Sequence, residues 1–405
     1  MMQMRNIAPT AAMMDNTVTG DCMNKFYEFF AGGGMVNAGL GDEWKCLFAN
    51  DFSEKKRAAY EANWGKDHFV PGDVGRVQLA QLPMQADLAW ASFPCQDLSV
   101  AGNGAGLKGK RSGTFWAFMK LIQQLREDRR KPRIIALENV YGAITSHAGK
   151  DFKAIIAALA AEGYRVGGMV IDAVHFVPQS RPRLFVVAVD EALQIPAALD
   201  GAQPTAAWHP RAITQAYGCL GEELRNRWVW WNLPTPEARR LTLEDIIEKE
   251  PQGVAWHSSE ETWNLRRMMS DVNQKKLIEA QQAGRVRVGA VYRRMREGQQ
   301  RAEVRFDGVS GCLRTPSGGS SRQTIMVVNG EDVKSRLLSP REASLLMGLD
   351  YDYILPERYN DAYHLAGDGV AVPVVAHLAQ HIFEPVLAHN QLQLPELPQD
   401  MAEAA

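Results

Sequence analysis

The strongest constraint on the fold is the order of apolar runs in the first half of the chain. Short apolar segments alternate there with helical patterns and with turns rich in glycine. The expected strands are residues 26–30, 45–49, 86–92, 133–137, 165–174 and 183–189, and the expected helices are 35–40, 53–63, 113–127 and 151–162. This order predicts an α/β fold with a doubly wound, mainly parallel sheet covered by helices. The loops that follow the strands of such a sheet form its ligand crevice.

Composition narrows the possible classes of protein. A length of 405 residues is enough for two domains, and the net charge of −2 means that any nucleic-acid contact must come from a local basic patch. The 5 cysteines include no CxxC pair, which favours a reducing compartment over a disulfide framework or a zinc cluster. His377 and His381 have no third ligand nearby, so no metal is expected. No apolar run is long enough to indicate a membrane span.

A glycine turn and two acidic residues indicate a nucleoside cofactor. The segment from Phe30 through Gly32 to Gly34 follows the first expected strand, where glycines allow a ligand to approach the backbone closely. Asp51 ends the second strand, at the place where an acidic residue usually accepts from ribose hydroxyls. Asp73 lies on the next turn and can accept from an adenine amino group. Because the loop lacks a phosphate-binding GxxxxGK[ST] pattern, S-adenosylmethionine fits better than a nucleotide with a pyrophosphate.

Cys95 directly follows Pro94 at the end of the third expected strand. A single cysteine is often only a small buried hydrophobic residue. A thiol at a strand end, facing a loop rich in glycine and lysine, is also well placed to be a nucleophile. The loop 98–113 is the natural lid, and its basic residues Lys108, Lys110 and Arg111 are expected to contact phosphates.

Two further strand ends carry charged side chains. Glu138 follows residues 134–137, either as a neighbour of a helix N-cap or as a site group near the thiol. Gln179, Arg181 and Arg183 alternate along an extended segment, so that all three point to one face. Burying three such side chains is costly without an anionic or strongly polar partner.

Together these segments resemble the DNA (cytosine-5)-methyltransferase family. The matching motifs are FxGxG at Phe30, Gly32 and Gly34, an acidic strand end at Asp51, GD at residues 72–73, PCQ at 94–96, ENV at 138–140, QxRxR at 179–183, an LTPRE-like segment at 338–342 and a GNxVP-like segment at 367–373. The chain departs from the usual pattern at Met35, at Leu98 and at Asp368, where the family usually has Asn.

The resemblance implies the S-adenosylmethionine-dependent methyltransferase fold and a reaction at carbon 5 of a flipped-out cytosine in duplex DNA. Its catalytic residues are then Cys95, Glu138, Arg181 and Arg183. Its cofactor-binding residues are Phe30, Gly32, Gly34, Asp51, Asp73, Pro94, Phe115, Asp368 and Val370. Cys95 attacks carbon 6, Glu138 holds the ring at N3 and the 4-amino group, and the arginines stabilise developing negative charge.

The middle of the chain loses the alternation of strands and helices. By the resemblance it is a smaller, irregular target recognition domain. We expect a lead at residues 1–22, a catalytic domain at 23–190, a recognition domain at 191–336, a hinge at 337–364, a return to the catalytic domain at 365–390 and a tail at 391–405. Six tryptophans, at positions 208, 228, 230, 231, 256 and 263, are expected to form a small core. DNA contacts are expected at Arg285, Arg287, Arg293, Arg314 and Arg322, although a run of arginines is also typical of a solvated helix face.

Two other functions stay open at this point. One is an RNA cytosine-5-methyltransferase on the same catalytic domain, against which the long inserted segment argues. The other is an inactive relative that only binds DNA, against which the intact Cys95, Glu138 and Arg183 argue. We expect double-stranded DNA as the partner, a monomer in the bacterial cytoplasm or nucleoid, and possibly a separate cognate restriction endonuclease.

Overall fold

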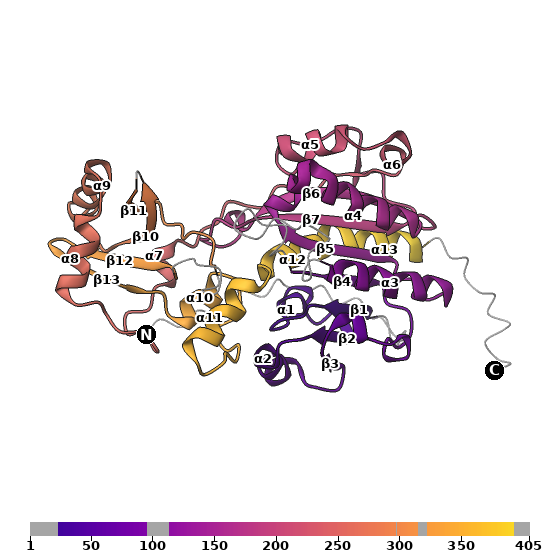
Figure 1. Cartoon of the computed structure of the whole chain (residues 1–405), viewed down its shortest axis with the longest axis horizontal. Helices are drawn as coiled ribbons and strands as arrows, with labels where there is room; N and C mark the ends of the chain where they lie inside the picture. Colours follow the sequence, from indigo (N-terminus) through magenta and orange to yellow (C-terminus); the bar gives the residue numbers. More distant parts are fainter. Residues whose placement is uncertain (1–22, 95–112, 297, 315–321, 393–405) are drawn as a thin grey trace, which may run out of the picture.

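The computed structural model describes residues 23–94, 113–296, 298–314 and 322–392. Their strands form a seven-stranded sheet, a four-stranded sheet and a two-stranded ribbon. Figure 1 shows the seven-stranded sheet and its helices at one end of the molecule and the four-stranded sheet at the other end. Helices α10 (Pro340–Leu345) and α11 (Tyr359–Asp368) lie between the two sheets.

The large sheet has the order β3-β2-β1-β4-β5-β7-β6. Its strands are β1 (Asn24–Phe29), β2 (Trp44–Asp51), β3 (Phe69–Pro71), β4 (Leu88–Ala91), β5 (Ile134–Val140), β6 (Tyr164–Asp172) and β7 (Pro182–Asp190). Strand β7 lies between β5 and β6 and is antiparallel to both, whereas the pairs on the other side of β5 are parallel. The predicted doubly wound, mainly parallel sheet is therefore confirmed.

Helices cover both faces of this sheet because alternate strand residues point to opposite sides. On one face, α3 (Thr114–Glu127) and α4 (Lys150–Ala161) pack on Tyr27, Phe29 and Ala89. Helix α3 buries Phe115, Phe118, Ile122 and Leu125, the spacing of one helix face. On the other face, α1 (Met35–Leu40) lies among the residues that cover Phe26 and Leu88. Helix α2 (Glu54–Trp64) follows β2.

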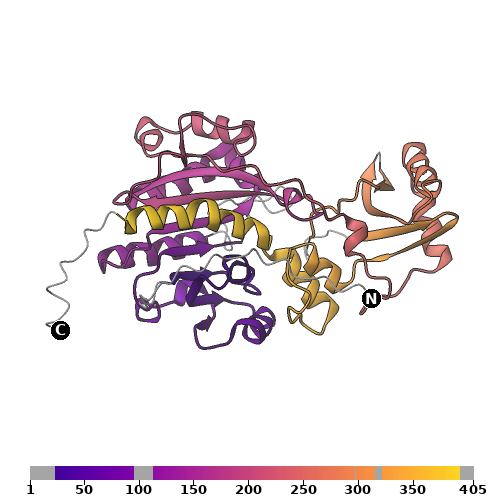
Figure 2. The ribbon, with the colours of Figure 1, turned by 180° about the vertical axis from the view of Figure 1, so that it is seen from behind.

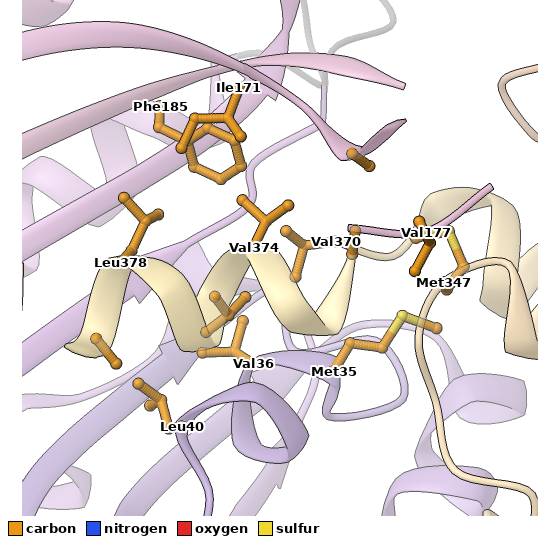
Figure 3. Close-up of a cluster of buried hydrophobic side chains, with 14 of the residues drawn as sticks. Met35, Val36, Leu40, Ile171, Val177, Phe185, Met347, Val370, Val374 and Leu378 are labelled. Carbon is orange, nitrogen blue, oxygen red and sulfur yellow. The ribbon is translucent and has the colours of Figure 1, made fainter. Parts of the chain in front are cut away.

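The C-terminal helices complete the second face. Figure 2 shows α12 (Val372–Leu378) and α13 (Glu384–Gln391) running across the sheet on the side away from α3 and α4. In Figure 3, Val374 and Leu378 of α12 lie between Val36 of α1 and Phe185 of β7. The helical run Tyr359–Gln391 is long and apolar enough to span a membrane, with a mean hydropathy of 1.4, but 61% of that window is buried inside the protein. It is a core element of this fold.

The four-stranded sheet is antiparallel, with the order β11-β10-β12-β13. Its strands are β10 (Arg287–Arg296), β11 (Gln299–Arg305), β12 (Thr324–Asn329) and β13 (Asp332–Leu337). Helices α8 (Ser259–Arg267) and α9 (Asp271–Gln281) bury Leu265 and Leu277 against Val304 and Met326. The run of arginines noted in the sequence lies mostly on β10 and β11. The alternative interpretation of this run as a solvated helix face is therefore wrong.

Residues 191–234 pack on the large sheet and not on the small one. They contain β8 (Asp200–Gly201), β9 (Trp230–Trp231), α5 (Arg211–Gly218) and α6 (Glu222–Asn226), and α7 (Leu243–Ile246) follows. The Val229 amide donates to the Val166 carbonyl of β6 at 3.0 Å, and Trp231 Nε1 donates to the Val187 carbonyl of β7 at 3.3 Å.

The tryptophans do not form a separate small core. Trp208 and Trp231 belong to the buried cluster on the α12 face of the large sheet, and Trp228 belongs to the cluster on the α3 face. Trp256 and Trp263 are 38% and 52% exposed. The expected tryptophan core of the recognition segment is therefore wrong, because three of its members cover the edge of the large sheet.

Candidate active site

A buried ion pair lies at the end of β5. Arg183 Nε of β7 is 3.2 Å from Glu138 Oε1, and the Glu138 side chain is nearly inaccessible to solvent. The antiparallel pairing of β5 with β7 produces this contact, since Val140 is opposite Arg183 in the register. Burial raises the pKa of the Glu138 carboxyl above its ordinary value, while the charges of Arg183 and Arg181 oppose the rise.

Asn139 connects this strand to the segment that leads into Cys95. Its Nδ2 donates to the Phe93 carbonyl at 3.1 Å in a buried position. Glu138 and Asn139 point to opposite sides of β5, so one faces Arg183 and the other fixes the chain before Pro94. The sequence prediction did not include Asn139, although it stands in the ENV motif. Cys95, Lys108, Lys110 and Arg111 lie outside the described residues.

Arg181 holds main-chain carbonyls from two distant segments. Its Nη2 donates to the carbonyls of Gly367 at 2.9 Å and Gly369 at 2.7 Å, and its Nη1 donates to Leu313 O at 3.3 Å. The side chain is 2% exposed, and burial lowers the pKa of its guanidinium. These contacts give Arg181 a positioning role beside Arg183.

Gln179 has a similar structural role. Its Nε2 donates to the Leu346 carbonyl at 2.7 Å, and its Oε1 accepts from the Leu313 amide at 3.0 Å. The polar partners that the QxRxR pattern required are therefore Glu138 for Arg183 and main-chain groups for Gln179 and Arg181.

The glycine turn after β1 is bound to Asp51. Asp51 Oδ2 accepts from the Gly32 amide at 2.9 Å, and its Oδ1 accepts from the Ser53 amide at 2.8 Å. A carboxylate has about four acceptor sites, so Asp51 can accept further hydrogen bonds from a ligand. Phe30 and Gly32 both have positive φ, 59° and 57°. A side chain at Gly32 would have only Lys56 Cδ, 4.0 Å away, within contact distance, so a ligand can approach the backbone there.

The other glycines of the turn serve packing. A Cβ at Gly34 would lie 2.2 Å from Trp64 Nε1, and one at Gly33 would lie 2.5 Å from the Tyr353 hydroxyl. Both of those side chains donate to the Gly33 carbonyl, at 3.0 and 2.6 Å. Gly34 is therefore required by Trp64, which the sequence pattern alone did not indicate.

The next strand end presents an acidic and an aromatic side chain. Asp73 is exposed, and its Oδ1 accepts from the Gly75 amide at 2.9 Å. Phe52, directly after Asp51, is 72% exposed, although it is a large aromatic residue. An exposed ring between two acidic strand ends offers a face on which an adenine could stack. The sequence prediction did not include Phe52, although the position of an aromatic residue directly after Asp51 could have indicated it.

Two predicted cofactor residues are core residues. Phe115 is 0% exposed and packs its ring 5.3 Å from the ring of Phe93, which precedes Pro94. Val370 is 4% exposed and lies beside Val374 and Val177 in the core cluster (Figure 3). Asp368, in contrast, is exposed and forms an ion pair with Lys56 of α2 at 2.8 Å.

Comparison with known proteins decides the family. The family model for C-5 cytosine-specific DNA methylases matches residues 24–384. The chain belongs to this family. It is an S-adenosylmethionine-dependent DNA (cytosine-5)-methyltransferase.

Relatives and solved structures agree with this assignment. The chain is 25% identical over 371 residues to the type II methyltransferase M.MspI of Moraxella sp, covering 91% of this chain and 72% of the relative. It is 28% identical over 360 residues to the type II methyltransferase M.NgoBI of Neisseria gonorrhoeae, covering 87% and 91%. The S. pombe Dnmt2 methyltransferase structure is similar in fold, with a TM-score of 0.56 and 15% identity over 89% of this chain and 99% of that one.

The methyltransferase has a basic cleft beside the four-stranded sheet, on the side that faces Arg181 and Arg183. The cleft has a volume of ≈ 760 Å³. Its lining includes Tyr292, Arg293, Arg294, Arg305, Cys312, Arg314 and Arg322. Cys312 Sγ lies 3.4 Å from Arg181 Nη1 and 3.5 Å from Arg183 Nη2, so the cleft reaches these two arginines.

The predicted DNA-binding residues separate into two groups. Arg293, Arg314 and Arg322 line the cleft, and Arg285 is exposed just before β10. Arg287 Nε, in contrast, lies 3.2 Å from Glu244 Oε1, and its Nη2 donates to the Phe306 carbonyl. The methyltransferase thus uses Arg287 to attach α7 to β10. Arg294 and Arg305, which belong to the same run of arginines, also line the cleft. Among the described residues, no cluster of three or more metal-ligating side chains is present.

Proposed function

We propose that the enzyme methylates its target cytosine through a covalent bond between Cys95 and carbon 6 of a base that has left the duplex. The observation that carries this proposal is the buried contact of Glu138 with Arg183 at 3.2 Å. Asn139 holds the Phe93 carbonyl, two residues before Cys95, next to the same strand end. An acid and a cation therefore lie beside the segment that leads to the expected nucleophile, which supports a site for a flipped base there.

The residues act on the ring in a defined order. The Cys95 thiolate adds to carbon 6, and the electrons of the 5,6 double bond become available at carbon 5. Glu138 donates its proton to N3, which takes up negative charge, and it accepts from the 4-amino group. Arg183 stabilises charge on the base oxygen. Bound S-adenosylmethionine supplies an electrophilic methyl group. A base then removes the carbon 5 proton, the 5,6 double bond re-forms and Cys95 leaves as a thiolate. N3 returns its proton to Glu138.

The proposed cofactor site lies across the ends of β1, β2 and β3. Asp51 accepts from the ribose hydroxyls, Asp73 accepts from the adenine amino group, and Phe52 stacks on the adenine. Phe30, Gly32 and Gly34 shape the turn beneath the cofactor. Phe115, Pro94 and Val370 support the site from the core side, since Phe115 and Val370 are buried.

We assign recognition of the target DNA sequence to residues 191–336, as the family resemblance implies. Within this segment, the position of the cleft supports the part from α7 onward as the DNA-recognition region, because residues 191–234 cover the large sheet. Arg293, Arg314 and Arg322 are the proposed DNA contacts. By analogy with relatives that carry type II names, we propose a bacterial cytoplasmic monomer that acts beside a separate restriction endonuclease.

A tritium-transfer assay tests the proposed substrate. Methyl groups labelled in the cofactor should enter duplex DNA and not RNA, and no label should be transferred without nucleic acid. Sequencing of methylated cytosines in DNA from an expressing host should then reveal one short motif. Labelling of RNA alone would contradict the DNA assignment, and binding without any labelling would indicate an inactive relative.

A further inference from the structure

The sulfur of Cys312 accepts hydrogen bonds from both arginines of the QxRxR motif. Arg181 Nη1 donates to Cys312 Sγ at 3.4 Å, and Arg183 Nη2 donates to it at 3.5 Å. A thiol sulfur is a weak acceptor, and an ionised donor or acceptor strengthens the hydrogen bond. Cys312 follows β11 in the recognition segment, so these contacts join that segment to the catalytic domain.

Main-chain contacts fix the backbone of Cys312 against the same motif. Two residues before it, the Ser310 amide donates to the Pro178 carbonyl at 2.8 Å. Directly after it, the Leu313 amide donates to Gln179 Oε1 at 3.0 Å. The cysteine backbone is therefore held on both sides without its side chain. Removal of the sulfur alone should leave this segment in place.

Each nitrogen of the Arg183 guanidinium has a contact. Nε lies 3.2 Å from Glu138 Oε1, Nη1 donates to the Pro182 carbonyl at 3.0 Å, and Nη2 donates to Cys312 Sγ at 3.5 Å. The guanidinium is planar, so contacts at three different nitrogens fix its orientation. The sulfur is the contact that comes from the recognition segment. It restricts rotation of the plane that faces Glu138.

Arg181 depends less on the sulfur than Arg183 does. The Arg181 guanidinium also donates to the carbonyls of Leu313, Gly367 and Gly369, which hold it from two segments. Loss of the sulfur should therefore release Arg183 and leave Arg181 in position.

The charges around Cys312 strengthen its contacts. Burial raises the pKa of the Cys312 thiol, but the positive charges of Arg181 and Arg183 outweigh burial, so the pKa lies below its ordinary value. Arg314, two residues further along the chain, acts in the same direction. The sulfur therefore ionises more readily than an ordinary thiol, and ionisation improves it as an acceptor.

We propose that Cys312 is a positioning residue for methyl transfer, because its sulfur orients the Arg183 guanidinium towards Glu138 and the target base. Cys312 itself forms no bond to the base or the cofactor. The inference rests on the proposed roles of Arg183 and Glu138, and it adds a residue of the recognition segment that holds one of them.

Two other roles predict different losses. Cys312 lines the basic cleft, so it could contact DNA directly, and its removal would then weaken DNA binding. It could also only fill space beside the arginines, and its removal would then lower stability. A positioning role instead predicts slower turnover with DNA affinity and stability retained.

Steady-state kinetics with duplex DNA separate these roles. Cys312→Ala should lower kcat about tenfold, because a displaced catalytic group is costly, and should change KM for DNA by less than about twofold. Cys312→Ser should recover to within about threefold of the native kcat, since a hydroxyl oxygen also accepts hydrogen bonds. Cys219→Ala removes an exposed cysteine at the end of α5 and should leave kcat unchanged.

A double variant tests whether Cys312 acts through Arg183. In an Arg183→Ala background, Cys312→Ala should change the single-turnover rate by less than about twofold, because no guanidinium is left to orient. Losses that multiply in the double variant would overturn the inference. So would a native kcat in Cys312→Ala, a loss confined to KM for DNA, or equal losses in the Ala and Ser variants together with lower stability in urea unfolding.

Failure of the underlying proposal gives a separate result. If Arg183→Ala alone turned over at the native rate, the proposed catalytic role of Arg183 would be wrong, whatever the Cys312 variants did.

Discussion

At the scale of single residues, Glu138 combines a buried carboxyl with a nearby cation. Burial raises the pKa of the Glu138 carboxyl, and the positive charge of Arg183, 3.2 Å away, opposes that rise. In the proposed mechanism this carboxyl donates a proton to N3, and a raised pKa favours the protonated form that this step needs.

Glu138→Gln tests this balance. Because the folded pKa of Glu138 is raised, its contribution to stability is fully present below the ordinary carboxyl pKa and is lost as the pH rises through the folded pKa. Glutamine has no such titration. The stability of the variant relative to the native chain, measured by urea unfolding, should therefore increase as the pH rises above the ordinary carboxyl pKa. Turnover should fall about a hundredfold or more, since the proton donor is lost. Identical pH profiles of stability would contradict the raised pKa.

Asp51→Ala tests the cofactor site at the same scale. The carboxylate holds the Gly32 amide and, in the proposal, the ribose hydroxyls. We expect weaker binding of S-adenosylmethionine by about 1–3 kcal/mol in calorimetry. Asp42→Ala on the exposed turn before β2 is the control and should change nothing. An unaltered dissociation constant for Asp51→Ala would show that Asp51 only stabilises the turn and does not bind the cofactor.

The sequence predicted the identity of the site residues better than their partners. Asp51, Glu138 and Arg183 could be found because each stands at a strand end. The partners of Arg181 could not be found, since Leu313, Gly367 and Gly369 lie far along the chain. Asn139 was missed because its acceptor is a main-chain carbonyl, and the residue types in a sequence do not show which carbonyls accept hydrogen bonds.

At the scale of secondary-structure elements, the contact between α1 and α12 fixes the C-terminal segment on the sheet. Gly39 allows the two helices to approach closely, because a Cβ there would lie 2.5 Å from Val375 Cβ and 2.7 Å from the Val372 carbonyl. The same contact supports Gly367 and Gly369, whose carbonyls bind Arg181. Helix packing is therefore linked to the position of Arg181.

Gly39→Ala should separate α1 from α12. Overpacking of this kind usually costs about 1–3 kcal/mol, and backbone atoms cannot move aside as a side-chain end can. Gly218→Ala at the end of α5 is the control, since no atom lies within 4 Å of its Cβ position. Thermal or urea unfolding should show a loss for the first variant only. Equal stability of both variants would contradict the close contact.

The element boundaries show what local patterns can predict. Helix α1 was predicted with its observed bounds, and α2, α3 and α4 within one residue at each end, because their apolar spacing and glycine ends are local signals. Strand β3 (Phe69–Pro71) was missed, since three residues carry no periodicity. The antiparallel insertion of β7 between β5 and β6 depends on pairing between strands and cannot be inferred from one strand.

At the scale of the whole molecule, the basic cleft extends from the four-stranded sheet to Cys312, which contacts Arg181 and Arg183. Arg293 on β10 and Arg314 after β11 both line this cleft. Arg287 belongs to the same strand as Arg293 but is bound to Glu244. The two arginines of β10 should therefore behave differently when they are removed.

Arg293→Ala and Arg287→Ala provide that comparison. Loss of a phosphate contact by Arg293→Ala should reduce the slope of log affinity against log salt by about one unit. Arg287→Ala should lower thermal stability and leave the salt slope unchanged. If instead Arg287→Ala flattened the slope, Arg287 would be a DNA contact after all. A changed methylation motif in Arg314→Ala would identify a base contact there.

The central claim is that Cys95 forms a covalent bond to carbon 6 while Glu138 and Arg183 hold the base. Long duplex DNA that contains 5-fluorocytosine tests it most directly, because the fluorine on carbon 5 cannot leave as a proton does. With S-adenosylmethionine present, the native chain should form a denaturation-resistant adduct, and peptide mapping by mass spectrometry should place the nucleotide on Cys95. Cys95→Ser should form no adduct. An adduct on another residue, or methylation of ordinary cytosine by Cys95→Ser at the native rate, would contradict the mechanism.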